Sequence, residues 1–288
     1  MFNFQALKLK GKNSDLFTSA QSAALIAGDI LKKYQNGFLK IYTKEDNSPV
    51  THADLEAQKV ISLELDKTGI PVLGEENLPD EDFEVPSLFW LVDPLDGTKG
   101  YIRGSAEFTI NIALVHYGHP IFGLIYAPVK SKLFAGLVNQ GALVMRTDQN
   151  VSPTYILPRK SFQENDPDPI LITSNQEGLG TTWVLQVRQS FKERNKNIQV
   201  IHGKSALKFG WLIEGEVHLY YRTSPCSTWD LAAGQALLES VGGAIVWKEL
   251  DKTTLYTDAL LKDVPVPFWA YANPKIYEIL DSCLLTIS

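Results

Sequence analysis

The sequence predicts a mixed α+β and α/β protein built in two halves, and the spacing of its apolar residues carries that prediction. In the first half, two helical patterns precede several strand patterns joined by short turns, which is typical of helices on one face of a mostly antiparallel sheet. In the second half, short apolar runs alternate with helical patterns, which favours an α/β layer. Between Arg146 and Pro169 the composition shifts to Thr, Asn, Ser, Pro and Asp, as at a domain boundary. We therefore expect an N-terminal domain over residues 1–160 and a C-terminal domain over residues 161–288.

Composition and charge restrict the class of protein. With 288 residues, of which 44% are hydrophobic and 21% charged, the chain is typical of a globular protein with one large or two modest domains. Its net charge of −6 argues against a protein that coats a nucleic-acid polymer, although a few local Lys and Arg residues could still bind one nucleotide. No apolar run is long enough for a signal peptide or a membrane span, so we expect a cytoplasmic protein, either a monomer or a homodimer. The two cysteines, Cys226 and Cys283, cannot form a disulfide framework and lack the paired spacing of a zinc site, so we expect them to be packing residues.

Two helices are predicted near the start of the chain. Apolar residues recur at a helical spacing over residues 14–34, which indicates one buried face. A polar loop then leads to a second helix that closes at Gly69. Thr51 and Asp54 at its start resemble a capping box, in which side chains bond the free N–H groups of the first turn. This role would by itself explain an acidic residue at position 54.

A short strand follows, over residues 71–76, and breaks at Gly74 into the adjacent acids Glu75 and Glu76. Neighbouring residues of a strand point to opposite faces of a sheet. We therefore expect at most one of the two glutamates to enter a site, and the other to be solvated or to cap a turn.

The most informative stretch begins with an apolar run, residues 88–92, which predicts a buried strand that stops at Asp93 and Pro94 because proline has no N–H to donate. Asp96 and Gly97 follow at once, and the glycine permits a tight turn after which backbone N–H groups can face an anion. Two carboxylates thus converge at one strand end, as a hard cation such as Mg²⁺ requires. An isolated Asp-Gly pair would indicate only a turn with a capping acid. The whole stretch, with further acidic motifs elsewhere, favours a metal site.

The remaining elements complete the two halves. Residues 108–114 alternate between apolar and polar or small side chains, which predicts a strand buried on one face only. An antiparallel meander continues over residues 121–126 and 133–138. In the second half we expect strands over residues 170–173, 198–201, 217–221 and 267–271, and helices over residues 182–194, 204–213, 229–241 and from Pro274 onward.

Asp230, in the first turn of the helix predicted from residue 229, is a further acidic element. Capping by Thr228, with Asp230 favoured by the helix dipole, would explain this position if it stood alone. However, four acidic elements occur in one order along the chain: Val50–Asp54, Gly74–Glu76, Trp90–Thr98 and Trp229–Gly234. Together they resemble the inositol monophosphatase superfamily of Mg²⁺-dependent, Li⁺-inhibited phosphatases, over about residues 20 to 275.

This resemblance implies a layered αβαβα fold with the active site between the two halves. It also implies which residues carry the chemistry. Asp54 with Thr98 corresponds to the pair that activates water. The metal ligands would be Glu75, Asp93, the backbone carbonyl of Leu95, Asp96 and Asp230.

The charges of these acids support a metal site independently of the resemblance. One pair of like charges about 4 Å apart costs on the order of 4 kcal/mol at an effective dielectric constant near 20. Only cations make such a cluster tolerable, and on the order of two to three Mg²⁺ ions would neutralise it and stabilise the departing alkoxide. The expected reaction is metal-assisted, in-line hydrolysis of a phosphate monoester, with no covalent intermediate on the protein.

The second half bears on which monoester is cleaved. Lys204–Phe209 and Leu219–Arg222 resemble the phosphate-recognition segment of the 3′(2′),5′-bisphosphate nucleotidase branch, as does Lys99–Gly104. The resemblance implies that Ser205, Lys208 and Arg222 hold the second phosphate of the substrate, next to Gly97, Thr98 and Asp230. Arg grips a phosphate with two hydrogen bonds and Lys acts as a point charge, so the chemistry fits. The alternative is that Lys208 is a solvated helix residue and Arg222 a charge at a strand end.

The function that these observations predict is removal of the 3′-phosphate from 3′-phosphoadenosine 5′-phosphate, giving AMP and phosphate, as in sulfate assimilation. The sulfated analogue, 3′-phosphoadenylyl sulfate, is a second possible substrate. An inositol phosphate or sugar phosphate phosphatase with the same metal site is the first alternative. A catalytically silent regulator that binds metal or nucleotide is the other, but such a protein is expected to have lost a ligand, and all six acidic and threonine positions are present.

Overall fold

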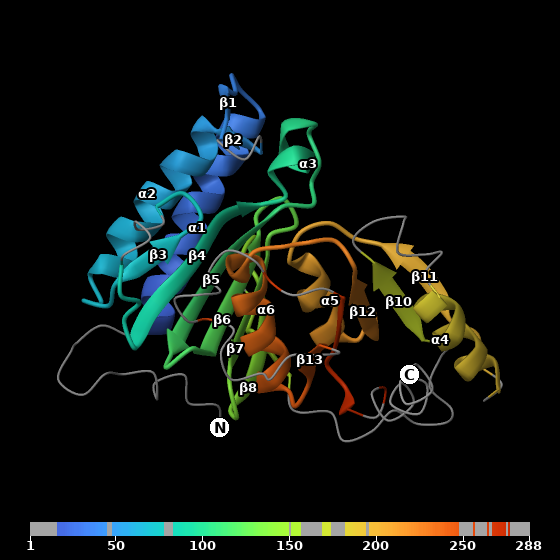
Figure 1. Ribbon diagram of the computed structural model, residues 1–288. Coiled ribbons are helices and arrows are strands. Elements are labelled where there is room, and N and C mark those ends of the chain that lie inside the picture. The colour runs from blue at the N-terminus through green and yellow to red at the C-terminus, as the bar shows by residue number, and fades with distance from the viewer. Residues whose placement is uncertain are drawn as a thin grey trace.

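The structure is a computed structural model, and it describes residues 16–44, 48–77, 83–149, 151–156, 169–173, 182–193, 196–247, 256, 264, 267–274 and 276. Figure 1 shows helices and sheets stacked in the order helix, sheet, helix, sheet, helix. In the described residues, no helix is both long enough and apolar enough to cross a bilayer. The predicted boundary between residues 160 and 161 lies outside the described residues.

The first outer layer consists of α1 (Leu16–Gln35) and α2 (His52–Asp66), which confirms the two predicted helices. They cover one face of a seven-stranded sheet whose strands follow one another in chain order. Only β3 and β4 are parallel, and the other pairs are antiparallel. The strands are β3 (Val72–Gly74), β4 (Leu88–Asp96), β5 (Thr109–His116), β6 (His119–Ala127), β7 (Lys132–Leu137), β8 (Gly141–Arg146) and β9 (Thr154–Ile156).

The central helix layer consists of α5 (Leu207–Glu214) and α6 (Thr228–Ser240), which lie between the two sheets. The second sheet has the order β11-β10-β12-β14-β13, and α4 (Thr182–Glu193) covers its outer face. Its strands are β10 (Ile170–Thr173), β11 (Gln199–His202), β12 (Leu219–Arg222), β13 (Ala244–Trp247) and β14 (Phe268–Tyr271). Strands β10, β11 and β12 pair in parallel, as strand–helix alternation predicts. Strand β14 runs antiparallel to both of its neighbours, β12 and β13, and β13 is a strand that the sequence did not indicate.

Both faces of the seven-stranded sheet are covered, and this corrects the expectation of a half-buried strand over residues 108–114. Ile110 and Ile112 of β5 pack toward α1 and α2, whereas Ala113 and Val115 pack toward α6. The polar residues Thr109 and Asn111 are therefore buried as well. Alternation along a strand shows that its two faces differ in character, but not whether a second layer covers the more polar one.

Strand β4 also continues further than its proline suggests. Asp93 pairs with Asn111 of β5, the register then shifts, and Asp96 pairs with Thr109. Pro94 removes one donor from the ladder, but the strand resumes beyond it with a local irregularity. The prediction that the ladder stops at Asp93 is wrong, and this continuation holds both aspartates at the same end of the sheet.

The amino end of α6 is brought close to this point because the helix lies directly on the sheet. A Cβ atom on Gly123 of β6 would lie 2.1 Å from the carbonyl oxygen of Ala233. Glycine at this position removes the side chain that would otherwise hold helix and sheet apart. The acidic first turn of α6 is thereby placed over the end of β4 (Figure 1).

Candidate active site

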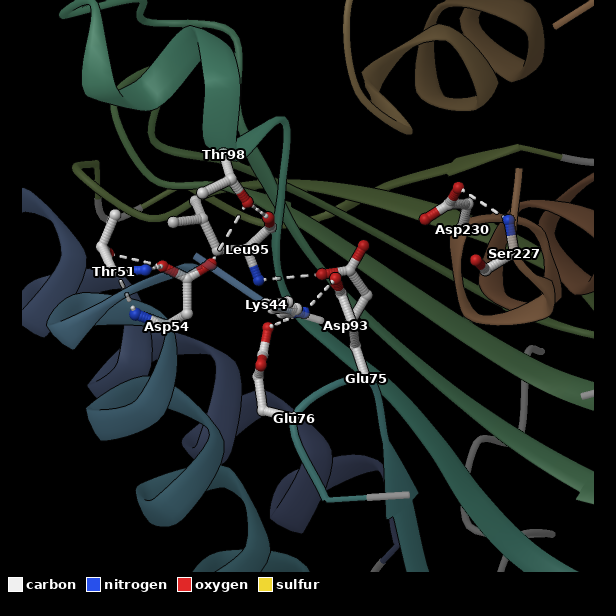
Figure 2. A network of polar contacts seen from close by, with 10 residues as sticks. All are labelled: Lys44, Thr51, Asp54, Glu75, Glu76, Asp93, Leu95, Thr98, Ser227 and Asp230. Carbon is white, nitrogen blue, oxygen red and sulfur yellow. Dashed lines mark hydrogen bonds and ion pairs between the residues drawn. The ribbon is translucent and has the colours of Figure 1, made fainter. Parts of the chain in front are cut away.

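The amino end of α2 provides Asp54, and both of its carboxylate oxygens have a partner. The hydroxyl of Thr51 accepts hydrogen bonds from the backbone N–H groups of Ala53 and Asp54, at 3.1 and 3.4 Å. Oδ2 of Asp54 closes the predicted capping box by accepting from the backbone N–H of Thr51 at 2.8 Å. Its Oδ1 accepts from the hydroxyl of Thr98 at 3.2 Å (Figure 2). Burial raises the pKa of Asp54, although these hydrogen bonds oppose that shift.

Thr98 is the first residue of a short helix, α3 (Thr98–Ile102), which follows Gly97. Gly97 has a φ of 99°, a left-handed conformation that glycine adopts without steric cost. Oγ1 of Thr98 lies 3.0 Å from the carbonyl oxygen of Leu95 and 3.2 Å from Oδ1 of Asp54. A hydroxyl carries one proton and donates it to one acceptor at a time. Thr98 is therefore placed to pass a proton to Asp54.

Asp93, Asp96 and Asp230 bring their carboxylates together, and one oxygen from each lies within 4.8 Å of the others. Asp93 and Asp96 come from β4. Asp230 comes from the first turn of α6, where it closes another capping box by accepting from the backbone N–H of Ser227 at 3.1 Å. Oδ1 of Asp93 accepts from the backbone N–H of Leu95 at 2.9 Å. Its Oδ2 is buried and, among the described residues, has no hydrogen-bond partner.

The electrostatics of this cluster call for a cation. Burial, together with the neighbouring carboxylates, raises the pKa of Asp93 well above its usual range. Burial and the charge of Asp96 raise the pKa of Asp230 to about 7. All the available ligand atoms are oxygens, and Asp93 has one oxygen that accepts no hydrogen bond from the described residues. These residues therefore fit a hard divalent cation such as Mg²⁺.

Glu75 and Glu76 lie in the turn after β3, and both bind a residue that sequence reasoning missed. Nζ of Lys44 lies 2.7 Å from Oε1 of each glutamate (Figure 2). The side chain of Glu76 is only 6% exposed, so the expectation of a solvated or capping second glutamate is wrong. Strand alternation does not govern the pair, because β3 ends before them. Burial raises the pKa of Glu75 despite Lys44, and raises that of Glu76 to about 7.

Lys44 reaches this position because it follows a short strand, β1 (Ile41–Thr43), which pairs with β2 (Pro49–Thr51). These two strands have only three residues each, and no apolar alternation marks them in the sequence. A single lysine in a polar stretch gave no signal of its role. The single charge of Lys44 offsets only part of the charge of Glu75 and Glu76. Glu75 is also close enough to Asp93 for its charge to raise the pKa of Asp93.

The predicted substrate residues lie on α5 and β12, next to the acidic cluster. Lys208 is 3% exposed and its ammonium donates to the carbonyl of Ser205 and lies 5.1 Å from the ring centroid of Tyr220. The alternative interpretation of Lys208 as a solvated residue is therefore wrong. Burial, with a further contribution from the charge of Arg222, lowers the pKa of Lys208 to about 8, whereas the carboxylate of Asp96 acts in the opposite direction. The buried ammonium of Lys208 and the partly buried guanidinium of Arg222 repel each other, and together they provide a site for an anion.

Arg222 is the last residue of β12, a position that its alternative interpretation as a charge at a strand end also expects. Its Nε donates to the carbonyl of Ser224 at 2.9 Å, and its Nη2 donates to the carbonyl of Pro225 at 2.8 Å. Ser205 has a φ of 53°, an uncommon conformation for a residue with a side chain. A Cβ on Gly97 would lie 3.7 Å from Cβ of Ser205. The turn at Gly97, which follows Asp96, is therefore in contact with Ser205, one of the residues predicted to bind the second phosphate.

The profile of the inositol monophosphatase family matches residues 12–261. The chain belongs to this family. The family is metal-dependent, and in this member the clustered carboxylates of Asp93, Asp96 and Asp230 are able to bind a metal ion.

Relatives within the inositol monophosphatase family include the 3′(2′),5′-bisphosphate nucleotidase CysQ of Escherichia coli strain K12. It is 34% identical over 224 residues, which covers 76% of this chain and 85% of the relative. The crystal structure of CysQ from Bacteroides thetaiotaomicron is 27% identical, with a TM-score of 0.69, and the match covers 88% of this chain and 96% of that one. SuhB from Bartonella henselae, 24% identical with a TM-score of 0.71 over 96% of this chain and all of that one, has the same fold.

Membership of the inositol monophosphatase family confirms two predictions, the family and the layered αβαβα fold. The four acidic motifs on which the resemblance rested all contribute to the site described above. The separate roles of Asp54, Thr98, the metal ligands and the substrate residues remain predictions.

Proposed function

We propose that this chain is a Mg²⁺-dependent 3′(2′),5′-bisphosphate nucleotidase that hydrolyses the 3′-phosphate of 3′-phosphoadenosine 5′-phosphate to AMP and phosphate, in sulfur metabolism. It would also accept 3′-phosphoadenylyl sulfate. The observation that carries the proposal is a pair of cations beside the acidic cluster, the buried Lys208 and the partly buried Arg222. A substrate with two phosphates fits this arrangement, because one phosphate can meet the metal site while the other meets the two cations. The similarity to the CysQ proteins supports the same assignment.

On this proposal, two to three Mg²⁺ ions are held by oxygens that converge on the end of β4. The ligands would be Glu75, Asp93, the carbonyl of Leu95, Asp96 and Asp230. When bound, the ions would polarise the phosphate ester and offset the negative charge that develops on its oxygens. The chain contributes by holding these carboxylates in place through the hydrogen bonds from Leu95 and Ser227.

Asp54 and Thr98 would handle the proton of the attacking water. Thr98 can accept that proton as it donates its own to Oδ1 of Asp54, which lies 3.2 Å away. The capping box holds Oδ2 of Asp54, so the carboxylate cannot turn away from Thr98. The raised pKa of Asp54 makes it a better base than an ordinary aspartate.

Ser205, Lys208 and Arg222 would bind the second phosphate, with Gly97, Thr98 and Asp230 lining the side toward the reacting one. Burial of Lys208 makes its charge act at full strength, since little water screens it. We also propose a cytoplasmic protein that acts as a monomer or a homodimer and binds no nucleic-acid polymer. The net charge of −6 supports the last point.

The test is phosphate release from 3′-phosphoadenosine 5′-phosphate, inositol 1-phosphate and fructose 1,6-bisphosphate, side by side with Mg²⁺, each with and without Li⁺. We expect the nucleotide to be cleaved faster than the others by about a hundredfold or more in kcat/KM, and Li⁺ to inhibit. Faster cleavage of inositol 1-phosphate would leave the metal site in place but contradict the role of Lys208 and Arg222. No release from any of the three would favour a catalytically silent regulator.

A further inference from the structure

Three buried oxygen atoms at one end of the β4–β5 pair have no hydrogen-bond partner among the described residues. They are Oδ2 of Asp93, Oγ1 of Thr109 and Oδ1 of Asn111, and each side chain belongs to a residue that is at most 1% exposed. Asp93 pairs with Asn111 across the two strands, and Asp96 pairs with Thr109. The three atoms therefore lie in one small region of the sheet.

The face of the sheet on which they lie follows from the packing of β5. Ala113 and Val115 pack toward α6, and side chains two residues apart on a strand share a face. Thr109 and Asn111 therefore point to the same side as Asp230, the acid at the start of α6. Polar side chains of β5 thus line the site where the three aspartates meet.

Among the described residues, Oδ2 of Asp93 and Oδ1 of Asn111 accept no hydrogen bond, and the hydroxyl of Thr109 neither accepts nor donates one. A buried oxygen left without a partner destabilises the fold, because it has lost its hydrogen bonds to water and gained none in exchange. Nδ2 of Asn111 lies 3.5 Å from Oδ2 of Asp96, which orients the amide so that its oxygen is the atom without a partner. Negative and neutral oxygens together call for a species that is positively charged and carries O–H donors. A hydrated divalent cation meets both requirements, because its inner water molecules are strong hydrogen-bond donors.

We propose that Thr109 and Asn111 form an outer wall of the metal site, where they hold the water molecules of a divalent cation whose direct ligands include Asp93 and Asp96. They are positioning residues, since they contact the water shell and orient Asp96 without binding the ion itself. This inference rests on the proposed metal site. It adds β5 to the elements that build that site.

The test uses Thr109→Val, which keeps the shape of the side chain and removes only the hydroxyl, and Asn111→Ala as a second variant. Mg²⁺ binding to chelator-treated protein is measured by calorimetry, and stability without metal by thermal unfolding. We expect each variant to bind Mg²⁺ about tenfold or more weakly. We expect the metal-free stability of Thr109→Val to be unchanged or higher, since an unpaired buried oxygen is lost.

Two controls separate this role from a structural one. Thr109→Ser keeps a hydroxyl and should bind Mg²⁺ nearly as the wild type does. Ile112→Val lies on the same strand but faces α1 and α2, so it should lower the Tm of the metal-free protein without changing Mg²⁺ affinity.

Wild-type Mg²⁺ affinity in both Thr109→Val and Asn111→Ala would overturn the inference. Metal-free destabilisation of Thr109→Val with unchanged Mg²⁺ affinity would likewise overturn it and assign the hydroxyl to packing. If the wild type itself binds no Mg²⁺, the proposed metal site fails and this inference fails with it, whereas a defect confined to the variants leaves the metal site intact.

Discussion

Single side chains in this site serve the backbone and the chemistry together. Asp54 and Asp230 each stand at the third position of a helix and each close a capping box. In Asp54 the oxygen not used by the cap faces Thr98, and Asp230 meets Asp93 and Asp96. An acid that caps a helix loses freedom to rotate, so the helix end holds a ligand or a base in place. The capping interpretation of these acids is therefore confirmed, and it is compatible with their predicted roles in the site.

Asp93→Asn should abolish turnover without unfolding the protein. The carboxylate of Asp93 is buried with a raised pKa next to Asp96 and Asp230, so a neutral amide relieves repulsion while it removes a metal ligand. We expect kcat to fall about a hundredfold or more and metal-free stability to stay the same or rise. Phosphate release and urea unfolding measure the two effects. Wild-type turnover in this variant would refute the assignment of Asp93 as a ligand.

Lys208→Met should separate binding of the second phosphate from chemistry. The substitution keeps most of the buried volume and removes the charge near Arg222. We expect KM for 3′-phosphoadenosine 5′-phosphate to rise about tenfold or more, since a charge-assisted hydrogen bond is lost. KM for a nucleoside 3′-monophosphate should change little.

Lys192→Met on α4 is the matched control, because Lys192 is exposed and lies on the outer helix. It should leave both KM values unchanged. Equal losses on both substrates in Lys208→Met would show that Lys208 does not distinguish a second phosphate.

At the scale of helices and strands, the packing of these elements brings the side chains of the site together. The first turns of α2, α3 and α6 lie around the end of β4, and each contains a residue of the site (Figure 1). The contact of α6 with β6 is therefore important, because it sets where Asp230 lies. Nε2 of His119, the first residue of β6, lies 2.7 Å from Oε2 of Glu239 near the end of α6.

The ion pair of His119 and Glu239 should make stability depend on pH near neutrality. The hydrogen bond to Glu239 raises the pKa of His119 above its usual 6.5, and partial burial opposes this. A raised pKa in the folded state means that the stabilisation is fully present below 6.5 and is lost as pH rises through the raised value. Because His119 is 43% exposed, we expect no more than about 1 kcal/mol.

Urea unfolding of the wild type and of Glu239→Gln between pH 5.5 and about 8.5 tests this. The difference in free energy of unfolding between the two proteins should shrink as pH rises. A constant difference would contradict a charged pair and indicate a neutral hydrogen bond.

Across the molecule, the site is assembled where layers meet. Acids come from the first sheet and from the central helices, and the cations Lys208 and Arg222 come from α5 and the second sheet. The stability of the folded chain is therefore tied to whether the acidic cluster is neutralised, by protons or by a metal.

Removal of metal should accordingly lower stability most at high pH. Burial raises the pKa of Asp230 from 3.8, and that of Glu76 from 4.5, in each case to about 7. For acids with a raised pKa in the folded state, the protonated form stabilises the fold below the unfolded pKa, and this is lost as pH rises through the folded pKa. In the presence of EDTA, we expect Tm to fall between about pH 5 and 8.

Added Mg²⁺ should restore Tm, with a larger increase at pH 8 than at pH 5, because protons no longer compete for the carboxylates. Thermal unfolding with and without Mg²⁺ across this range provides the measurement. An equal Mg²⁺ effect at both pH values would show that the ion does not bind the buried acids.

Much of this structure was predictable. Strand β10 has the bounds that its apolar run predicts, and α1, α2, α4 and α6 agree with their helical patterns to within a few residues. The acids of the site stand in motifs that also mark helix starts and strand ends, so their positions could be recognised locally. The contact of Lys44 with Glu75 could not be recognised from the sequence. It joins residues 31 positions apart, and the hairpin that positions Lys44 is too short to show a periodic pattern of apolar residues.

The sequence by itself determined the family, most of the longer helices and strands, and the acids of the four motifs. Apolar periodicity and capping motifs are local properties, so they can be recognised in the sequence as short-range patterns. Only the tertiary structure decided that Thr109 and Asn111 are buried, that Glu76 pairs with Lys44, and that Lys208 is hidden from water. Burial depends on which layer covers a face of a sheet or helix, and charge pairing depends on how distant segments fold together. Neither can be deduced from the spacing of neighbouring residues.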